Sequence, residues 1–171
     1  MSQTTAQESV RDYIMRALLR DLGALEREVM AYPDDETLWR VVPGITNSGG
    51  NLALHLAGNV RQNVGANLGD TGFVRDREAE FSARGLTRSV VAAQVADAMA
   101  HVSRTLTTLD PARLDMVYPV QLYERSFRTD ALLLHIVTHL AYHLGQVDYH
   151  RRMVTGDGAI ADTLSLKAMA I

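Results

Sequence analysis

Cysteine is absent from all 171 residues, so the chain has no disulfide, no thiolate metal ligand and no protein thiol nucleophile. Any metal ion that it binds must therefore be held by nitrogen and oxygen ligands. The chain also lacks an apolar run of the roughly 20 residues that cross a bilayer. Its first residues, MSQTTAQESVRDY, lack the apolar segment of a secretory signal. We therefore expect a cytoplasmic protein that does not insert into a membrane.

A strong excess of charge of either sign is also lacking. The formal net charge is −3, and the basic residues are dispersed along the chain. This pattern predicts neither nucleic-acid binding nor attachment to a membrane surface.

Proline is scarce, with four residues, and little of the sequence alternates between apolar and polar positions. Both features favour helices over strands. A chain of this length can bury roughly two thirds of its unfolded surface in one core, so we expect a single domain over residues 1–171.

Apolar periodicity and breaker residues predict four long helices. They are expected at Thr5–Tyr32, at Ser48–Leu68, at Thr87–Leu109, and over Asp130–Met153 with Thr129 as N-cap. An irregular crossover that contains Trp39 joins the first two helices, and Trp39 is expected to cap one end of the core, with a role in a pocket wall as the alternative. The connection Gly69–Leu86 carries mixed charges, which predicts a solvated surface; closure over the site or a subunit contact is the alternative.

The last predicted helix carries three regularly spaced histidines. His135, His139 and His143 follow one another at intervals of four residues, which places them in a stripe on one face. Two neighbouring imidazoles of this kind can bind one zinc, nickel or iron ion. Surface or hydrogen-bonded core histidines are the alternative, but the apolar residues around the stripe predict burial, and buried imidazoles need partners.

A third ligand is available on the second predicted helix. His55 shares a face with Leu52 and Leu56, and alone it would be interpreted as a core histidine. Helices in a bundle pack about 8–10 Å apart, and two imidazoles can meet halfway. His55, His139 and His143 are therefore the candidate metal ligands.

These motifs carry a family resemblance. LALHLAGN around His55, FVRDREAEF after the second predicted helix, and THLAYHLGQ around His139 and His143 resemble the DinB/YfiT-like family of four-helix metal-binding proteins, in particular its subgroup of unknown function. The resemblance covers roughly residues 8–155. It implies an all-α, up-down-up-down four-helix bundle, a divalent metal on the three histidines, and a homodimer, which light scattering would test.

Two other metal chemistries are excluded by the motifs. No glutamate has a histidine three residues later, as di-iron carboxylate bundles require, and no HExxH is present. A three-histidine site with open positions remains. Zinc or nickel is expected first, with iron, cobalt or manganese as alternatives.

Three functions stay open for such a site. The resemblance favours a metal-dependent S-transferase that joins a low-molecular-weight thiol to a small electrophile. A metal-dependent hydrolase of esters or amides is the second, since a bound water can be activated near neutral pH. The third is a non-enzymatic dimer with a structural metal. The catalytic residues and the substrate are not indicated by the sequence.

Other polar residues are expected outside the ligand set. His135 lies a further turn from His139, His150 is too distant to share the metal, and His101 is expected to be exposed. Gln146, three residues after His143, can reach the neighbourhood of the metal by a hydrogen bond.

Overall fold

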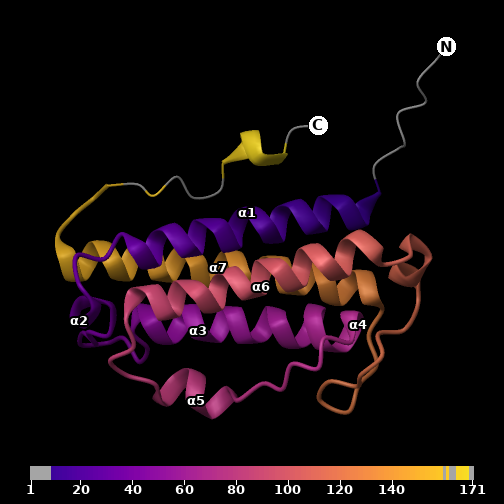
Figure 1. Ribbon diagram of the computed structural model, residues 1–171, viewed down its shortest axis with the longest axis horizontal. Helices are drawn as coiled ribbons and strands as arrows, with labels where there is room; N and C mark the ends of the chain where they lie inside the picture. The colour runs from indigo at the N-terminus through magenta and orange to yellow at the C-terminus, as the bar shows by residue number, and fades with distance from the viewer. Residues whose placement is uncertain (1–8, 160, 162–164, 170–171) are drawn as a thin grey trace.

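The computed structural model describes residues 9–159, 161 and 165–169. Within these ranges every regular element is a helix, accompanied by two isolated β-bridges. The predicted all-α class is therefore confirmed for the described residues. Figure 1 shows the long helices lying side by side. None of the helices in the described ranges is long and apolar enough to cross a membrane.

The long predicted helices are present, with short ones between them. The elements are α1 (Val10–Met30), α2 (Asp35–Leu38), α3 (Gly49–Val60), the π-helix η1 (Arg61–Ala66), α4 (Asn67–Gly69), α5 (Arg77–Ser82), α6 (Arg88–Thr108), the 3-10 helix η2 (Pro111–Asp115), α7 (Thr129–Thr155) and the 3-10 helix η3 (Leu166–Met169). α3, η1 and α4 follow one another without a break. The predicted start of the first helix, Thr5, lies outside the described residues.

Side-chain caps fix several helix starts. Ser48 accepts a hydrogen bond from the backbone N–H of Asn51 at the start of α3, and Thr87 accepts one from Val90 at the start of α6. Such caps satisfy amides that have no partner inside the helix. Thr129 was predicted as the N-cap of the last helix but is its first residue, with Arg128 as N-cap.

The order of helix directions differs from the prediction. Arg11 of α1 donates to the carbonyl of Leu109 at the end of α6, so α1 and α6 are antiparallel. Gly65 lies against His101 and Gly69 against Thr105, in the same order along both segments, so α3–η1–α4 and α6 run parallel. The predicted up-down-up-down order is therefore wrong; the order is up-down-down-up.

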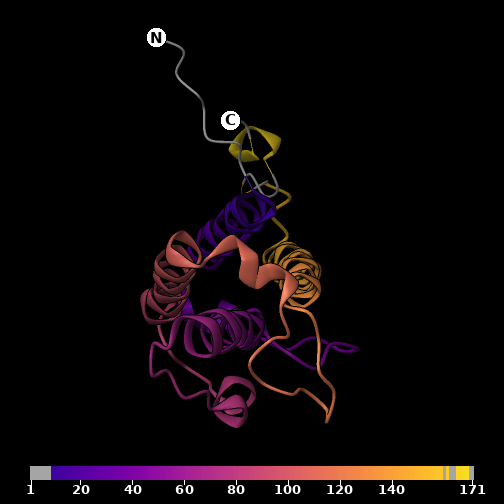
Figure 2. The same cartoon turned by 90° about the vertical axis from the view of Figure 1, so that its right-hand side faces the viewer.

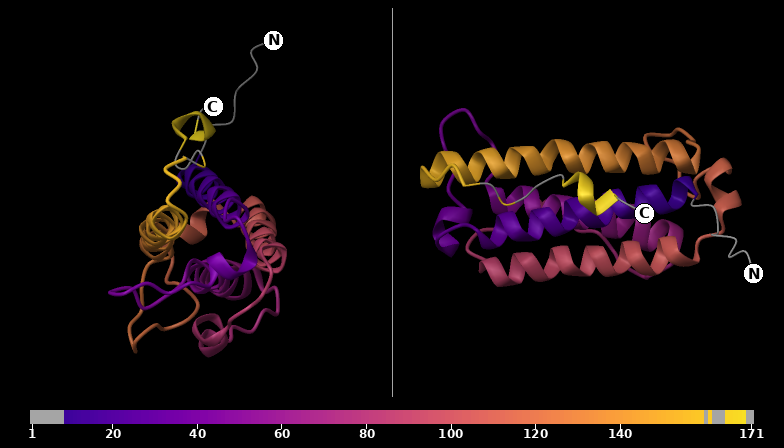
Figure 3. Two further views of the ribbon diagram at one scale, coloured as in Figure 1. Left: turned by 90° about the vertical axis from the view of Figure 1, so that its left-hand side faces the viewer. Right: turned by 90° about the horizontal axis from the view of Figure 1, so that it is seen from above.

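The physical reason is the connection between α4 and α6. This segment runs back along α3, with α5 in its middle, and starts α6 at the end where α3 began (Figure 1). A connection that returns along a helix lets the next helix run parallel to it. Viewed from the ends, α1 and α3 lie diagonally opposite, each between α6 and α7 (Figures 2 and 3).

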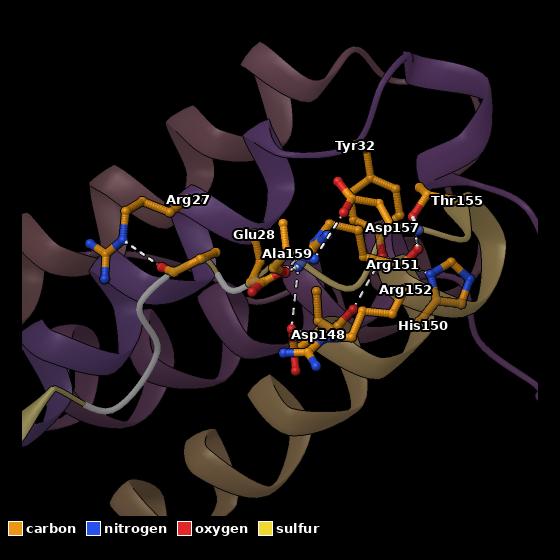
Figure 4. Close-up of polar contacts among 12 residues, drawn as sticks. Arg27, Glu28, Tyr32, Asp148, His150, Arg151, Arg152, Thr155, Asp157 and Ala159 are labelled. Atoms are coloured by element: carbon orange, nitrogen blue, oxygen red, sulfur yellow. Dashed lines mark hydrogen bonds and ion pairs between the residues drawn. The ribbon is translucent and has the colours of Figure 1, made fainter.

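A buried polar cluster ties α1 to α7 and to the C-terminal segment (Figure 4). Arg151 of α7 pairs with Glu28 of α1 through Nε and Oε2 at 2.6 Å, and both side chains are almost fully buried. Nη2 of Arg151 donates to the carbonyl of Ala159 at 2.6 Å. Burying a charged group is costly unless an opposite charge pairs with it, so the buried Glu28 and Arg151 each depend on the other.

Removing one member of this pair tests its role in stability. Glu28→Ala leaves the Arg151 guanidinium buried without its carboxylate, and we expect unfolding free energy to fall by about 3–5 kcal/mol. Urea denaturation measures this loss, and Glu26→Ala on the same helix is the control. Equal, small losses in both variants would contradict the assigned role.

Candidate metal centre

Three histidines from two helices converge where α3 faces α7. His55 is buried on α3, while His139 and His143 are half-buried on α7. One nitrogen from each imidazole lies within 4.8 Å of the corresponding nitrogens of the other two. The structure therefore brings together the three residues that the sequence selected, in a cluster that could hold a metal ion.

The spacing inside the cluster suits coordination. Nε2 of His55 lies 3.4 Å from Nε2 of His139. Zinc–nitrogen bonds of about 2.0–2.1 Å at tetrahedral angles place two nitrogen ligands about 3.3 Å apart. Two of the three donor atoms are thus already separated as ligands of one ion would be.

A carboxylate and a guanidinium stand behind His55. Nδ1 of His55 lies 3.2 Å from Oε2 of Glu80, and Arg75 pairs with both carboxylate oxygens of Glu80 at 2.6 Å. Nη2 of Arg75 also lies 3.0 Å from the same Nδ1. The two neighbours select opposite tautomers, since Glu80 accepts a hydrogen bond whereas Arg75 donates one. Only the tautomer that donates Nδ1–H to Glu80 leaves the Nε2 lone pair free for a metal.

His143 is oriented in a similar way. Its Nδ1 lies 2.6 Å from Oε1 of Gln146, one turn further along α7. When Nδ1–H donates to this oxygen, Nε2 becomes the unprotonated nitrogen of the ring. Ligating histidines commonly carry such a partner on the other nitrogen, which fixes both the tautomer and the ring plane. The sequence-based expectation for Gln146 is therefore supported by its contact.

The helix that supplies Glu80 is fastened to α3. The Asn51 side-chain amide donates to the carbonyls of Glu80, Phe81 and Ala83, at 2.9, 3.1 and 3.1 Å. The Phe81 ring packs on the His55 imidazole with centroids 4.9 Å apart. α5 thus covers one side of the cluster.

Gly58 leaves the room that Glu80 needs. A Cβ built at Gly58 would lie 2.0 Å from Oε1 of Glu80, far inside contact distance. The carboxylate can therefore reach His55 only because position 58 has no side chain. The glycine of the HLAGN motif has this packing role.

The electrostatics favour an ionised Glu80 and a neutral His139. Burial acts to raise the pKa of Glu80, but hydrogen bonds from Arg75 and His55 outweigh it, and the net pKa is lowered. Burial, followed by the nearby His143 and His55, lowers the pKa of His139 to about 4. A neutral imidazole is the form that binds a metal.

The other histidines lie outside the cluster, although not all as predicted. His135 is exposed, and its ring centroid lies 5.9 Å from that of His139. His150 is buried and contacts the Tyr32 hydroxyl at 2.7 Å. His101 was predicted to be exposed; it is half-buried because its ring packs on Gly65.

Sequence reasoning missed the roles of Arg75, Glu80 and Asn51. The charged connection was interpreted first as a solvated surface, whereas Glu80 is buried against His55. Asp76, which caps α5 by accepting from Ala79, marks the start of a short helix with Glu80 and Phe81 in its second half. That cap was the one local sign that the segment was ordered.

Comparison with known proteins gives one match. A protein-family model described as "Protein of unknown function (DUF1572)" matches residues 7–166. No curated protein and no solved structure matches the chain.

The low pKa of His139 predicts a pH dependence of stability in metal-free protein. An unfolded histidine takes up its proton near pH 6.5, whereas folded His139 stays neutral down to about pH 4. The unfolded state therefore binds more protons in this window, and stability falls as the pH decreases through it. His139→Gln lacks this contribution, so we expect its free energy of unfolding to fall less between those two pH values than that of the parent. Urea denaturation of both proteins, after a chelator has removed any metal, measures the difference. Parallel profiles for the parent and the variant would contradict the assignment.

Proposed function

The chain belongs to the DUF1572 family, and from the geometry of its histidine cluster we propose that it binds one divalent metal ion through His55, His139 and His143. We further propose that it is a metal-dependent enzyme of the thiol S-transferase type. The observation that carries the proposal is the 3.4 Å distance between Nε2 of His55 on α3 and Nε2 of His139 on α7. Hydrogen-bond partners behind His55 and His143 support it.

The donor set indicates the kind of metal. Three neutral imidazoles with an outer carboxylate suit zinc or nickel, and iron, cobalt or manganese also accept such ligands. With three protein ligands, the coordination sphere retains a position for another molecule, as in catalytic rather than structural zinc sites. His139 and His143 are only half-buried, so this side is accessible to a small molecule.

The transferase class is supported by the sequence resemblance to the DinB/YfiT-like four-helix bundles. When bound, the ion supplies a Lewis acid that can hold a low-molecular-weight thiol as its thiolate or polarise a carbonyl group. Since the chain has no cysteine, the thiol must arrive as a cosubstrate.

The residues of the chain have separate tasks in this proposal. Glu80 and Gln146 each accept an Nδ1–H and so direct the opposite nitrogens of His55 and His143 toward the ion. Arg75 keeps Glu80 ionised by pairing with both of its oxygens. Phe81 packs against the His55 ring and restricts water on that side.

Metal content tests the proposal first. Protein purified without an affinity tag and loaded with zinc should hold about one ion per chain by mass spectrometry of the metal. His55→Ala and His139→Ala should lose that ion, whereas His135→Ala, an exposed imidazole on the same helix, should keep it. A parent protein that stays metal-free after loading would overturn the proposal.

The loaded protein then distinguishes the enzyme classes. Thiol-dependent consumption of an electrophile that disappears in His139→Ala would support the transferase. Metal-dependent hydrolysis of an ester without any thiol would instead assign the hydrolase class. If the metal raises the melting temperature but neither reaction exceeds its background rate, the metal has a structural role.

Glu80 should tune zinc affinity without being a ligand. Glu80→Gln keeps the shape but removes the charge that favours Nδ1–H on His55, and we expect zinc affinity to fall roughly 10- to 100-fold. Competition with a chromophoric chelator measures the change. Glu78→Gln, an exposed residue of the same short helix, is the matched control. Unchanged affinity in Glu80→Gln would exclude the orienting role.

A further inference from the structure

A cavity next to the metal centre gathers an unusual number of side-chain amides. It has a volume of about 410 Å³, and five of its lining residues carry carboxamides: Asn59, Gln62, Asn63, Asn67 and Gln121. We call it the carboxamide cavity. Arg75 and His135 also line it, and these two residues connect it to the histidine cluster.

Two of the amides have unused hydrogen-bonding capacity. Gln62 accepts from the backbone N–H of Arg75 and donates to Asn67. The side chains of Asn59 and Gln121, in contrast, make no hydrogen bond to the described residues. Asn59 is half-buried and Gln121 is exposed, so both amides remain open to hydrogen bonds from water or a ligand.

The backbone around the cavity departs from regular structure. Gln62 and Asn63 belong to the π-helix η1, a form that is rare and frequently occurs at functional sites. The buried Tyr118 donates its hydroxyl to the carbonyl of Asn63 at 2.8 Å. The irregular turn of the helix is therefore tied to the connection between α6 and α7, which supplies Gln121 and Leu122 to the cavity lining.

That connection contains a strained hairpin. Leu122 and Arg125 exchange both backbone hydrogen bonds at 3.0 Å, and the two residues between them, Tyr123 and Glu124, have φ angles of 53° and 59°. Two non-glycine residues in the left-handed region make an unfavourable turn, and such strain gathers at ligand-binding sites. Figure 2 shows this connection and α5 on the same side of α3.

The charges define the ligand class. No acidic residue is among the described residues that line the cavity, and its one guanidinium, on Arg75, is paired with Glu80. The amides offer both donors and acceptors, so the lining suits a neutral group rich in hydroxyl or amide functions.

We propose that the carboxamide cavity binds the non-reacting, uncharged polar part of a small substrate whose reactive atom lies at the histidine cluster. Its role as a substrate subsite rests on the proposed function, whereas its ability to bind such a group does not. A substrate held at two places is oriented for reaction, which is the energetic use of binding away from the reacting atom.

A matched pair of probes tests the ligand class. N-acetylserinamide carries a hydroxyl and two amides without charge, and N-acetylserine differs by a terminal carboxylate. We expect the first to shift the side-chain NH₂ signals of Asn59 and Gln121 in nitrogen–proton NMR spectra, saturably and more tightly than the second. Tighter binding of N-acetylserine, or no saturable shift with N-acetylserinamide, would overturn the proposal.

Single substitutions test the location. Asn59→Leu and Gln121→Met should each weaken N-acetylserinamide binding roughly two- to tenfold, as expected for one lost hydrogen bond. Gln121 is exposed, so its variant should fold normally. The control is Asn47→Leu, in the separate cavity on the other side of His143. Loss of binding in Asn47→Leu alone would place the site in that cavity and contradict the proposal.

Measuring metal-free and zinc-loaded protein separates the two proposals. Probe binding in both forms supports the subsite independently of the metal. Zinc binding without probe binding would support the metal site and reject the carboxamide cavity as a binding site. Probe binding without zinc binding would support the cavity as a binding site and reject the metal site.

Discussion

The contact between Glu80 and His55 is the interaction on which the geometry of the candidate site depends. It joins α5 to α3, and when Nδ1–H of His55 donates to Glu80 the opposite nitrogen, Nε2, which lies near His139, is left free. Two other features make it available: Gly58 provides the space, and Arg75 compensates the buried charge. A carboxylate behind a ligating histidine raises the basicity of the imidazole and holds its ring, so a residue that touches no ion can control how well one binds.

The three histidines of the cluster could be selected from the sequence because helical periodicity is a local property. The four-residue spacing of His139 and His143, and the shared face of His55 and Leu52, depend only on the helix itself. The helix directions were not predictable in this way. Tertiary contacts decide whether the segment after α4 turns back beside α3 before the next helix begins. The sequence prediction assumed that successive long helices alternate in direction, whereas α3 and α6 run parallel.

The same limit explains why Glu80 was missed. Its charged neighbours indicate a solvated segment, whereas tertiary contacts, such as those of Asn51 with α5, hold this segment against α3. The π-helix η1 was also not predicted from the sequence. The carboxamides of Asn59 and Asn63 lie one turn apart in the sequence, but their cavity exists only because the hairpin with Gln121 covers them.

An X-ray absorption spectrum of the zinc-loaded protein counts the imidazole ligands and so tests the proposed set of three histidines. We expect three imidazole nitrogens at about 2.0–2.1 Å, with the remaining coordination filled by oxygen from solvent. In His143→Ala the imidazole scattering should fall to two rings. A spectrum with four protein ligands, or with three imidazoles still present in that variant, would contradict the assignment of His55, His139 and His143 as the metal site.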